Sequence, residues 1–144
     1  QYNIYKWYGK EINFIDEKFT QAQPGLTYAK LENGGIWSLA IDCFDNQYAR
    51  EVVETCWQGR NVYKSDFALL HCGFSDKLTF EICWAENYEV PEDNPNAVDI
   101  CELPGAGSFI NLASSVASIA VSEFIRNGTK RNFIGNRFSV REMI

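Results

Sequence analysis

Residues Ile36 to Phe44 read IWSLAIDCF, a run that polar side chains interrupt only at Ser38 and Asp42. A near-continuous apolar run of this length is typical of a central parallel strand that is covered on both faces. A polar cluster follows it immediately. The stretch therefore predicts an α/β domain built around a buried strand over Ile36–Phe44.

A helix is predicted directly after this strand, because apolar residues then return at helical spacing. They are Ala49, Val52, Val53, Cys56 and Trp57. Either Asp45 or Asn46 can cap the first turn, and Gly59 can end the helix.

The other elements give the order β-(α)-β-α-β-β-α-β, a mixed sheet in a single domain spanning residues 1–144. A long, mobile loop is expected over Tyr88–Pro104, where Pro, Asp and Asn are frequent. The strands are expected over Glu11–Phe19, Phe67–Phe74, Leu78–Trp84 and Asn132–Met143, and the helices over about Gly25–Glu32 and over Ser108–Arg126.

Charge and cysteine usage narrow the class of protein. The formal net charge is −6, which disfavours nucleic acid as a partner, because phosphate backbones select basic surfaces. The five cysteines are odd in number and form no C-x-x-C pair, so we expect free thiols of a cytoplasmic protein instead of zinc ligands or disulfides. We expect no signal peptide and no membrane span, since the stretch Phe109–Ile125 is short and interrupted by polar residues.

Two carboxylates lie where the buried strand ends. Asp42 and Asp45 would reach the carboxyl end of the sheet, where open α/β sheets bind ligands. Asp45 is well placed there to hold Mg²⁺ beside nucleotide phosphates, and Arg50, one turn into the helix, can brace Asp45 or face a phosphate. Alternatively, Asp45 only caps the helix and Asp42 bonds to a neighbouring turn. His71, the only histidine, is either a hydrogen-bonded core residue or a base.

The sequence Asp42-Cys43-Phe44-Asp45-Asn46, followed by Ala49-Arg50, resembles the D-x-x-D-N-x-x-A-R segment of the E1-like superfamily. This superfamily includes ubiquitin-activating enzymes and the bacterial ThiF, MoeB and HesA proteins. The downstream strands, the loop and the Ala/Ser-rich helix also follow in family order. The resemblance implies the C-terminal half of a Rossmann-like, E1-type adenylation domain.

In that family the domain adenylates the C-terminal glycine of a ubiquitin-like or sulfur-carrier protein, using Mg-ATP. The resemblance assigns the Mg-ATP contact to Asp45, and Asn46 and Arg50 match further motif positions. We take Asp42 and Asn46 as candidates for nucleotide binding, and Asp45 and Arg50 as candidates for catalysis. Many members also carry a cysteine that accepts the activated protein. Cys101 is the candidate, although the acidic residues that flank it would raise a thiol pKa.

The chain departs from the family pattern in one essential part. It contains no G-x-G-x-x-G phosphate loop, and neither Gly34-Gly35 nor Gly105-Ala106-Gly107 has the required setting. We therefore expect the chain alone to be inactive, and to be completed by a missing N-terminal half, a separate chain or a homodimer partner that packs on Ser108–Arg126. The alternatives are a non-catalytic E1-like binding or scaffold subunit and an unrelated small α/β binding protein.

Overall fold

A computed structural model describes residues 38–58, 67–75 and 77–143 of the chain. The expected elements over 11–19 and 25–32 lie outside these residues. The described strands form one sheet whose spatial order is the chain order, and two α-helices and two 3-10 helices connect them. The elements are β1 (Ser38–Asp42), α2 (Gln47–Gln58), β2 (Phe67–Phe74), β3 (Thr79–Trp84), η2 (Ala85–Asn87), η3 (Ile100–Glu102), α4 (Ala106–Asn127), β4 (Asn132–Asn136) and β5 (Ser139–Met143).

The sheet is mixed, as predicted. Strands β1 and β2 are parallel and are joined through α2, which places Asp42 directly beside His71. The remaining pairs, β2–β3, β3–β4 and β4–β5, are antiparallel. The α/β class is therefore confirmed, with a parallel pair at one end of the sheet and an antiparallel meander at the other.

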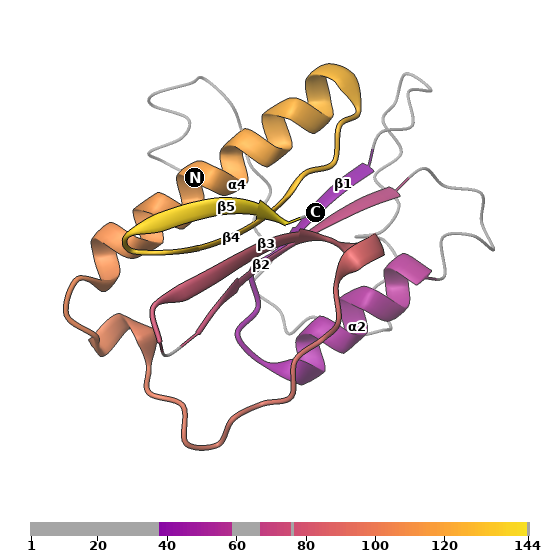
Figure 1. The fold of residues 1–144 in the computed structure, drawn as a ribbon. Coiled ribbons are helices and arrows are strands. Elements are labelled where there is room, and N and C mark those ends of the chain that lie inside the picture. Colours follow the sequence, from indigo (N-terminus) through magenta and orange to yellow (C-terminus); the bar gives the residue numbers. More distant parts are fainter. Residues whose placement is uncertain (1–37, 59–66, 76, 144) are drawn as a thin grey trace, which may run out of the picture.

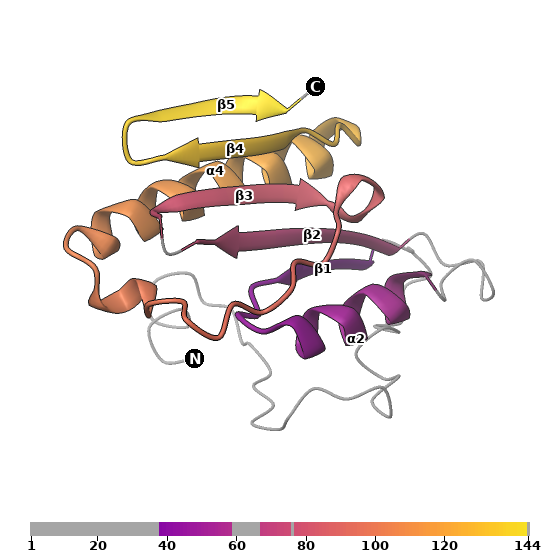
Figure 2. The same cartoon turned by 60° about the horizontal axis from the view of Figure 1, so that its bottom comes forward.

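The two helices cover opposite faces of this sheet (Figure 1). Alternate residues of β2 separate the faces, since Ala68 and Leu70 pack in the cluster under α4, whereas Leu69 packs with Val53 of α2. In the turned view of Figure 2, α4 runs behind β3 and β4, and α2 lies beside β1. The larger hydrophobic core lies between α4 and the sheet.

Helix α4 confirms the prediction over Ser108–Arg126 and is slightly longer. Its buried positions recur every three or four residues, as an amphipathic helix requires. They are Ala106, Phe109, Ala113, Val116, Ala120 and Phe124. Gly128 ends the helix in the left-handed region, with φ 73°, and donates its N–H to the Phe124 carbonyl at 2.8 Å. The small residues Ala113 and Ala120 are thus used against the protein's own sheet.

Helix α4 is also long and apolar enough to cross a membrane by length and composition alone. It has 22 residues and a mean hydropathy of 1.4 over its most apolar window, so the prediction that this stretch is too short and too polar is wrong. One side of the helix packs on the sheet, but Ile119 and Ile125 on its outer side are exposed, so the core accounts for only part of its apolar character.

The prediction of a central, fully covered first strand is also wrong for the described residues. Strand β1 is the terminal strand of the sheet that they form, and Ile41 exposes 51% of its surface. Asp42, in contrast, is buried at 2% exposure. The apolar run correctly indicated a strand, but it carries no information about which neighbours pair with that strand.

The closing segment is a hairpin, not the single strand expected over Asn132–Met143. Strands β4 and β5 pair with each other around a turn at Arg137-Phe138. The Asn136 side-chain carbonyl accepts the N–H groups of Phe138 at 2.8 Å and of Ser139 at 3.0 Å. Asn commonly folds a turn in this way, and the turn chemistry overrides the alternating pattern.

Candidate functional site

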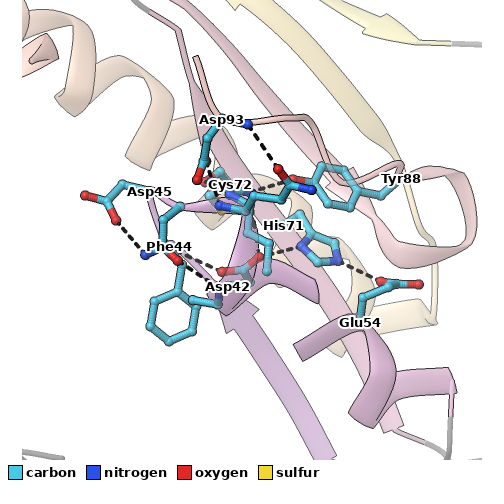
Figure 3. Close-up of polar contacts among 12 residues, drawn as sticks. Asp42, Phe44, Asp45, Glu54, His71, Cys72, Tyr88 and Asp93 are labelled. Carbon is cyan, nitrogen blue, oxygen red and sulfur yellow. Dashed lines mark hydrogen bonds and ion pairs between the residues drawn. The ribbon is translucent and has the colours of Figure 1, made fainter. Parts of the chain in front are cut away.

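The carboxyl end of β1 and the start of α2 enclose a buried polar cluster, which Figure 3 shows. Asp42 exposes 2% of its surface and His71 none. One carboxylate oxygen of Asp42 lies 2.6 Å from His71 Nδ1, and the other accepts the Phe44 N–H at 2.9 Å. Asp42 therefore connects β2 to the segment that follows β1.

Both ring nitrogens of His71 lie within hydrogen-bonding distance of carboxylate oxygens. Its Nε2 lies 3.3 Å from a carboxylate oxygen of Glu54 on α2, and its ring stacks on Tyr88 with centroids 3.8 Å apart. Since both ring nitrogens face carboxylate oxygens, both can donate only when the imidazole carries two protons. The interpretation of His71 as a hydrogen-bonded core residue is confirmed.

Arg50 completes the cluster from α2 and exposes only 6% of its surface. Its Nη1 donates to the Tyr88 hydroxyl at 2.6 Å and lies 3.6 Å from Asp42, and its Nη2 donates to the Cys72 carbonyl at 3.3 Å. Burial raises the pKa of the Tyr88 hydroxyl, so this group remains a neutral partner for the guanidinium. These contacts occupy both terminal nitrogens of Arg50 inside the protein.

Asp45 and Asn46 lie at the exposed mouth of the same segment. The Asn46 side-chain oxygen accepts the Ala49 N–H at 2.9 Å, so Asn46 is the residue that caps α2. The Asp45 carboxylate accepts the Asn46 side-chain N–H at 3.2 Å and lies away from Glu54 in Figure 3. Asp42 and Asp45 thus have different environments, one buried and bonded, the other open to solvent.

The loop after β3 is fastened to this site at two points. Tyr88 stacks on His71, and Asp93 exchanges two hydrogen bonds with Gln47, at 2.7 Å and 3.2 Å. Sequence reasoning missed Glu54, Tyr88 and Asp93. Glu54 carried a usable signal, because it lies four residues after Arg50 and so on the same side of the helix. Tyr88 and Asp93 reach the site only through tertiary folding.

Two thiols adjoin the cluster. A hydrogen bond from Cys72 lowers the pKa of the exposed Cys43 thiol to about 7, whereas the same bond and burial raise the pKa of Cys72. Cys101, the nucleophile candidate from the sequence, lies in η3, but its side chain is outside the described part of the structure. Among the described residues, no group of three acidic, His or Cys side chains forms a metal cluster.

The arrangement consists of a rigid base and an exposed tip. Hydrogen bonds, one ion pair and one pair of stacked rings join β1, α2, β2 and the loop after β3. The side chains that make these contacts are Asp42, Arg50, Glu54, His71 and Tyr88. Asp45 projects from the segment that Asp42 holds through the Phe44 N–H. An exposed carboxylate on a fixed backbone is suited to a hard cation, whereas the buried carboxylate is already fully engaged.

No protein-family model matches this chain, and no curated protein matches it at a significant level.

Proposed function

We propose that this chain is part of a ThiF-type adenylyltransferase, the C-terminal half of a Rossmann-like, E1-type adenylation domain. It would activate the C-terminus of a ubiquitin-like or sulfur-carrier protein with Mg-ATP, in the cytoplasm. Asp45 would bind Mg²⁺ beside the phosphates, with Asn46 next to the nucleotide. The phosphate loop would come from an N-terminal half or from a separate chain, because these 144 residues contain no G-x-G-x-x-G sequence.

The observation that carries the proposal is the difference in burial and bonding between the two aspartates of the D-x-x-D-N segment. Asp42 is the last residue of β1 and is buried against His71, whereas Asp45 follows the strand and is exposed at its carboxyl end. In open α/β sheets that end is where ligands bind. A carboxylate reserved for a ligand is expected to be exposed and lightly bonded, as Asp45 is.

The exposure of strand β1 supports the proposal that another half completes the domain. β1 ends the sheet of the described residues although its sequence is that of an internal strand, and Ile41 is 51% exposed. A parallel strand with apolar side chains is normally covered by neighbours. We infer that a strand of the completing half pairs with β1, which would bring the phosphate loop to the Asp45 side of the sheet.

Reconstitution tests this function. The chain is purified alone and together with the segment encoded immediately upstream, and pyrophosphate–ATP exchange is measured with a ubiquitin-like protein ending in glycine. The expected result is no exchange by the chain alone and Mg²⁺-dependent exchange by the complex. A complex that contains a G-x-G-x-x-G segment but neither binds ATP nor exchanges pyrophosphate would overturn the proposal.

The second candidate is a non-catalytic E1-like binding or scaffold subunit. The burial of Arg50 favours it, because this arginine is used by Tyr88 and Cys72 and not offered to a phosphate. The outer side of α4 would then be the partner surface, since Ile119 and Ile125 expose 52% and 70% there. A complex with a carrier protein that forms equally well without ATP, and never exchanges pyrophosphate, would identify this function.

A further inference from the structure

Two cysteines lie side by side at the mouth of the site. Asp42, the last residue of β1, pairs in register with His71, so Cys43 directly after β1 lies next to Cys72, the residue that follows His71 on β2. Residues beside each other on parallel strands point to the same face, and each of the two thiols shifts the pKa of the other, which requires them to lie close together. Cys43 is exposed to solvent, whereas Cys72 is buried at 6% exposure.

The spacing of these residues suits a covalent bond between them. Neighbouring strands lie about 4.8 Å apart, and the Cα atoms of a disulfide are usually about 4.4–6.8 Å apart. The backbone of Cys72 is also fixed, because its carbonyl accepts a hydrogen bond from the buried Arg50. The pair therefore combines a thiol that a small reagent can reach with a held partner thiol next to it.

We propose that Cys43 is an oxidation site for peroxides and that Cys72 converts its oxidised form into a Cys43–Cys72 disulfide. This inference does not depend on the adenylyltransferase proposal, because it concerns only the two thiols and their neighbours. The bond would fix the residue two positions before Asp45 covalently to β2. Oxidation would thereby restrict the segment that carries the exposed carboxylate.

The chemistry proceeds in two balanced steps, with peroxide as the two-electron oxidant. The Cys43 sulfur attacks one peroxide oxygen, the O–O bond breaks, and the departing hydroxide takes the thiol proton and leaves as water, giving a sulfenic acid. The Cys72 sulfur then attacks the Cys43 sulfur, and the S–O bond breaks. A second water leaves with the Cys72 proton, and the disulfide remains.

Peptide mapping of the whole chain tests the proposal directly. The purified protein is treated with hydrogen peroxide, its remaining thiols are alkylated, and it is digested with trypsin without a reductant. Trypsin leaves Cys43 in the peptide 31–50 and Cys72 in the peptide 65–77, while the other three cysteines fall in 51–60 and 78–126. The expected product is peptide 31–50 linked to peptide 65–77. Most of the Cys43 in the sample should be in this product, and a reductant should separate the two peptides.

Matched variants identify the role of each thiol. Cys43→Ser should abolish the linked pair, and Cys72→Ala should leave Cys43 as a sulfenic acid that a dimedone probe captures. Cys83→Ser, which alters a buried thiol on β3, should leave the link unchanged. The wild-type map alone can overturn the proposal, if Cys43 remains alkylated after peroxide treatment or links to a peptide other than 65–77.

Discussion

On the α4 face of the sheet, Phe80, Trp84 and Phe109 are buried among other apolar side chains, whereas the buried groups on the α2 face include Asp42, Arg50 and His71. Apolar packing is non-directional and depends mainly on volume. A buried polar cluster depends on the identity of each partner, because a charge left without its partner is costly. The comparison indicates that the α4 face stabilises the fold, while the α2 face fixes the position of particular atoms.

The largest effect on stability should come from the centre of the polar cluster. Asp42→Asn keeps the shape of the side chain but removes the charge that faces His71 and Arg50. We expect the free energy of unfolding to fall by about 3–5 kcal/mol. Chemical denaturation would measure it, with Glu89→Ala as the exposed control, which should stay within about 0.5 kcal/mol of the wild type. A loss below about 1 kcal/mol would remove the distinction between the two faces.

A substitution at the rim of the same cluster, at Tyr88, should lower the free energy of unfolding by less. Tyr88→Phe preserves the ring that stacks on His71 and removes only the hydroxyl that accepts from Arg50. The expected loss is about 1–3 kcal/mol, the cost of leaving one buried donor unsatisfied. Unfolding in urea measures it, and Glu89→Ala, at an exposed residue next to Tyr88, is the control. Equal, small changes in the two variants would show that the hydroxyl contributes little.

The apolar face should tolerate a change of shape. Phe109→Leu retains an apolar side chain on the side of α4 that packs on the sheet, so we expect a loss of no more than about 1.5 kcal/mol. Comparing it with Asp42→Asn in the same denaturation series gives the sharpest contrast, because both replacements are close in size to the original residue. If Phe109→Leu is the more damaging variant, the order of sensitivity proposed for the two faces is wrong.

Helix α2 begins at the site, so the residue that caps its first turn contributes both to the stability of the fold and to the position of the site. Asn46→Ala removes the side-chain acceptor of the Ala49 N–H, and the expected loss is about 1 kcal/mol. Asn46→Asp should restore most of it, because a carboxylate also caps a helix. If Asn46→Ala unfolds at the wild-type urea concentration, Asn46 does not cap α2 in solution.

The strands and helices with strong periodic patterns were predictable, and the contacts between distant elements were not. The β2 and α4 patterns gave the correct type of element, because burial on one face leaves a period in the sequence. The position of β1 at the end of the sheet that the described residues form, and the hairpin after Asn136, depended on pairing and turn geometry. The place of Asp45 at the end of β1 was predictable, because it closely follows the apolar run, whereas Tyr88 enters the cluster from 38 residues beyond Arg50, which no local pattern records.

The central claim is that Asp42 maintains the site and Asp45 performs its chemistry, and one variant tests it most directly. Asp45→Asn is compared with the wild type in the complex with the upstream segment, measuring thermal unfolding and pyrophosphate–ATP exchange on the same sample. We predict an unchanged melting temperature, because Asp45 is exposed, and a loss of exchange of at least about a hundredfold, because the Mg²⁺ ligand is removed. Exchange at the wild-type rate, with folding intact, would contradict the account.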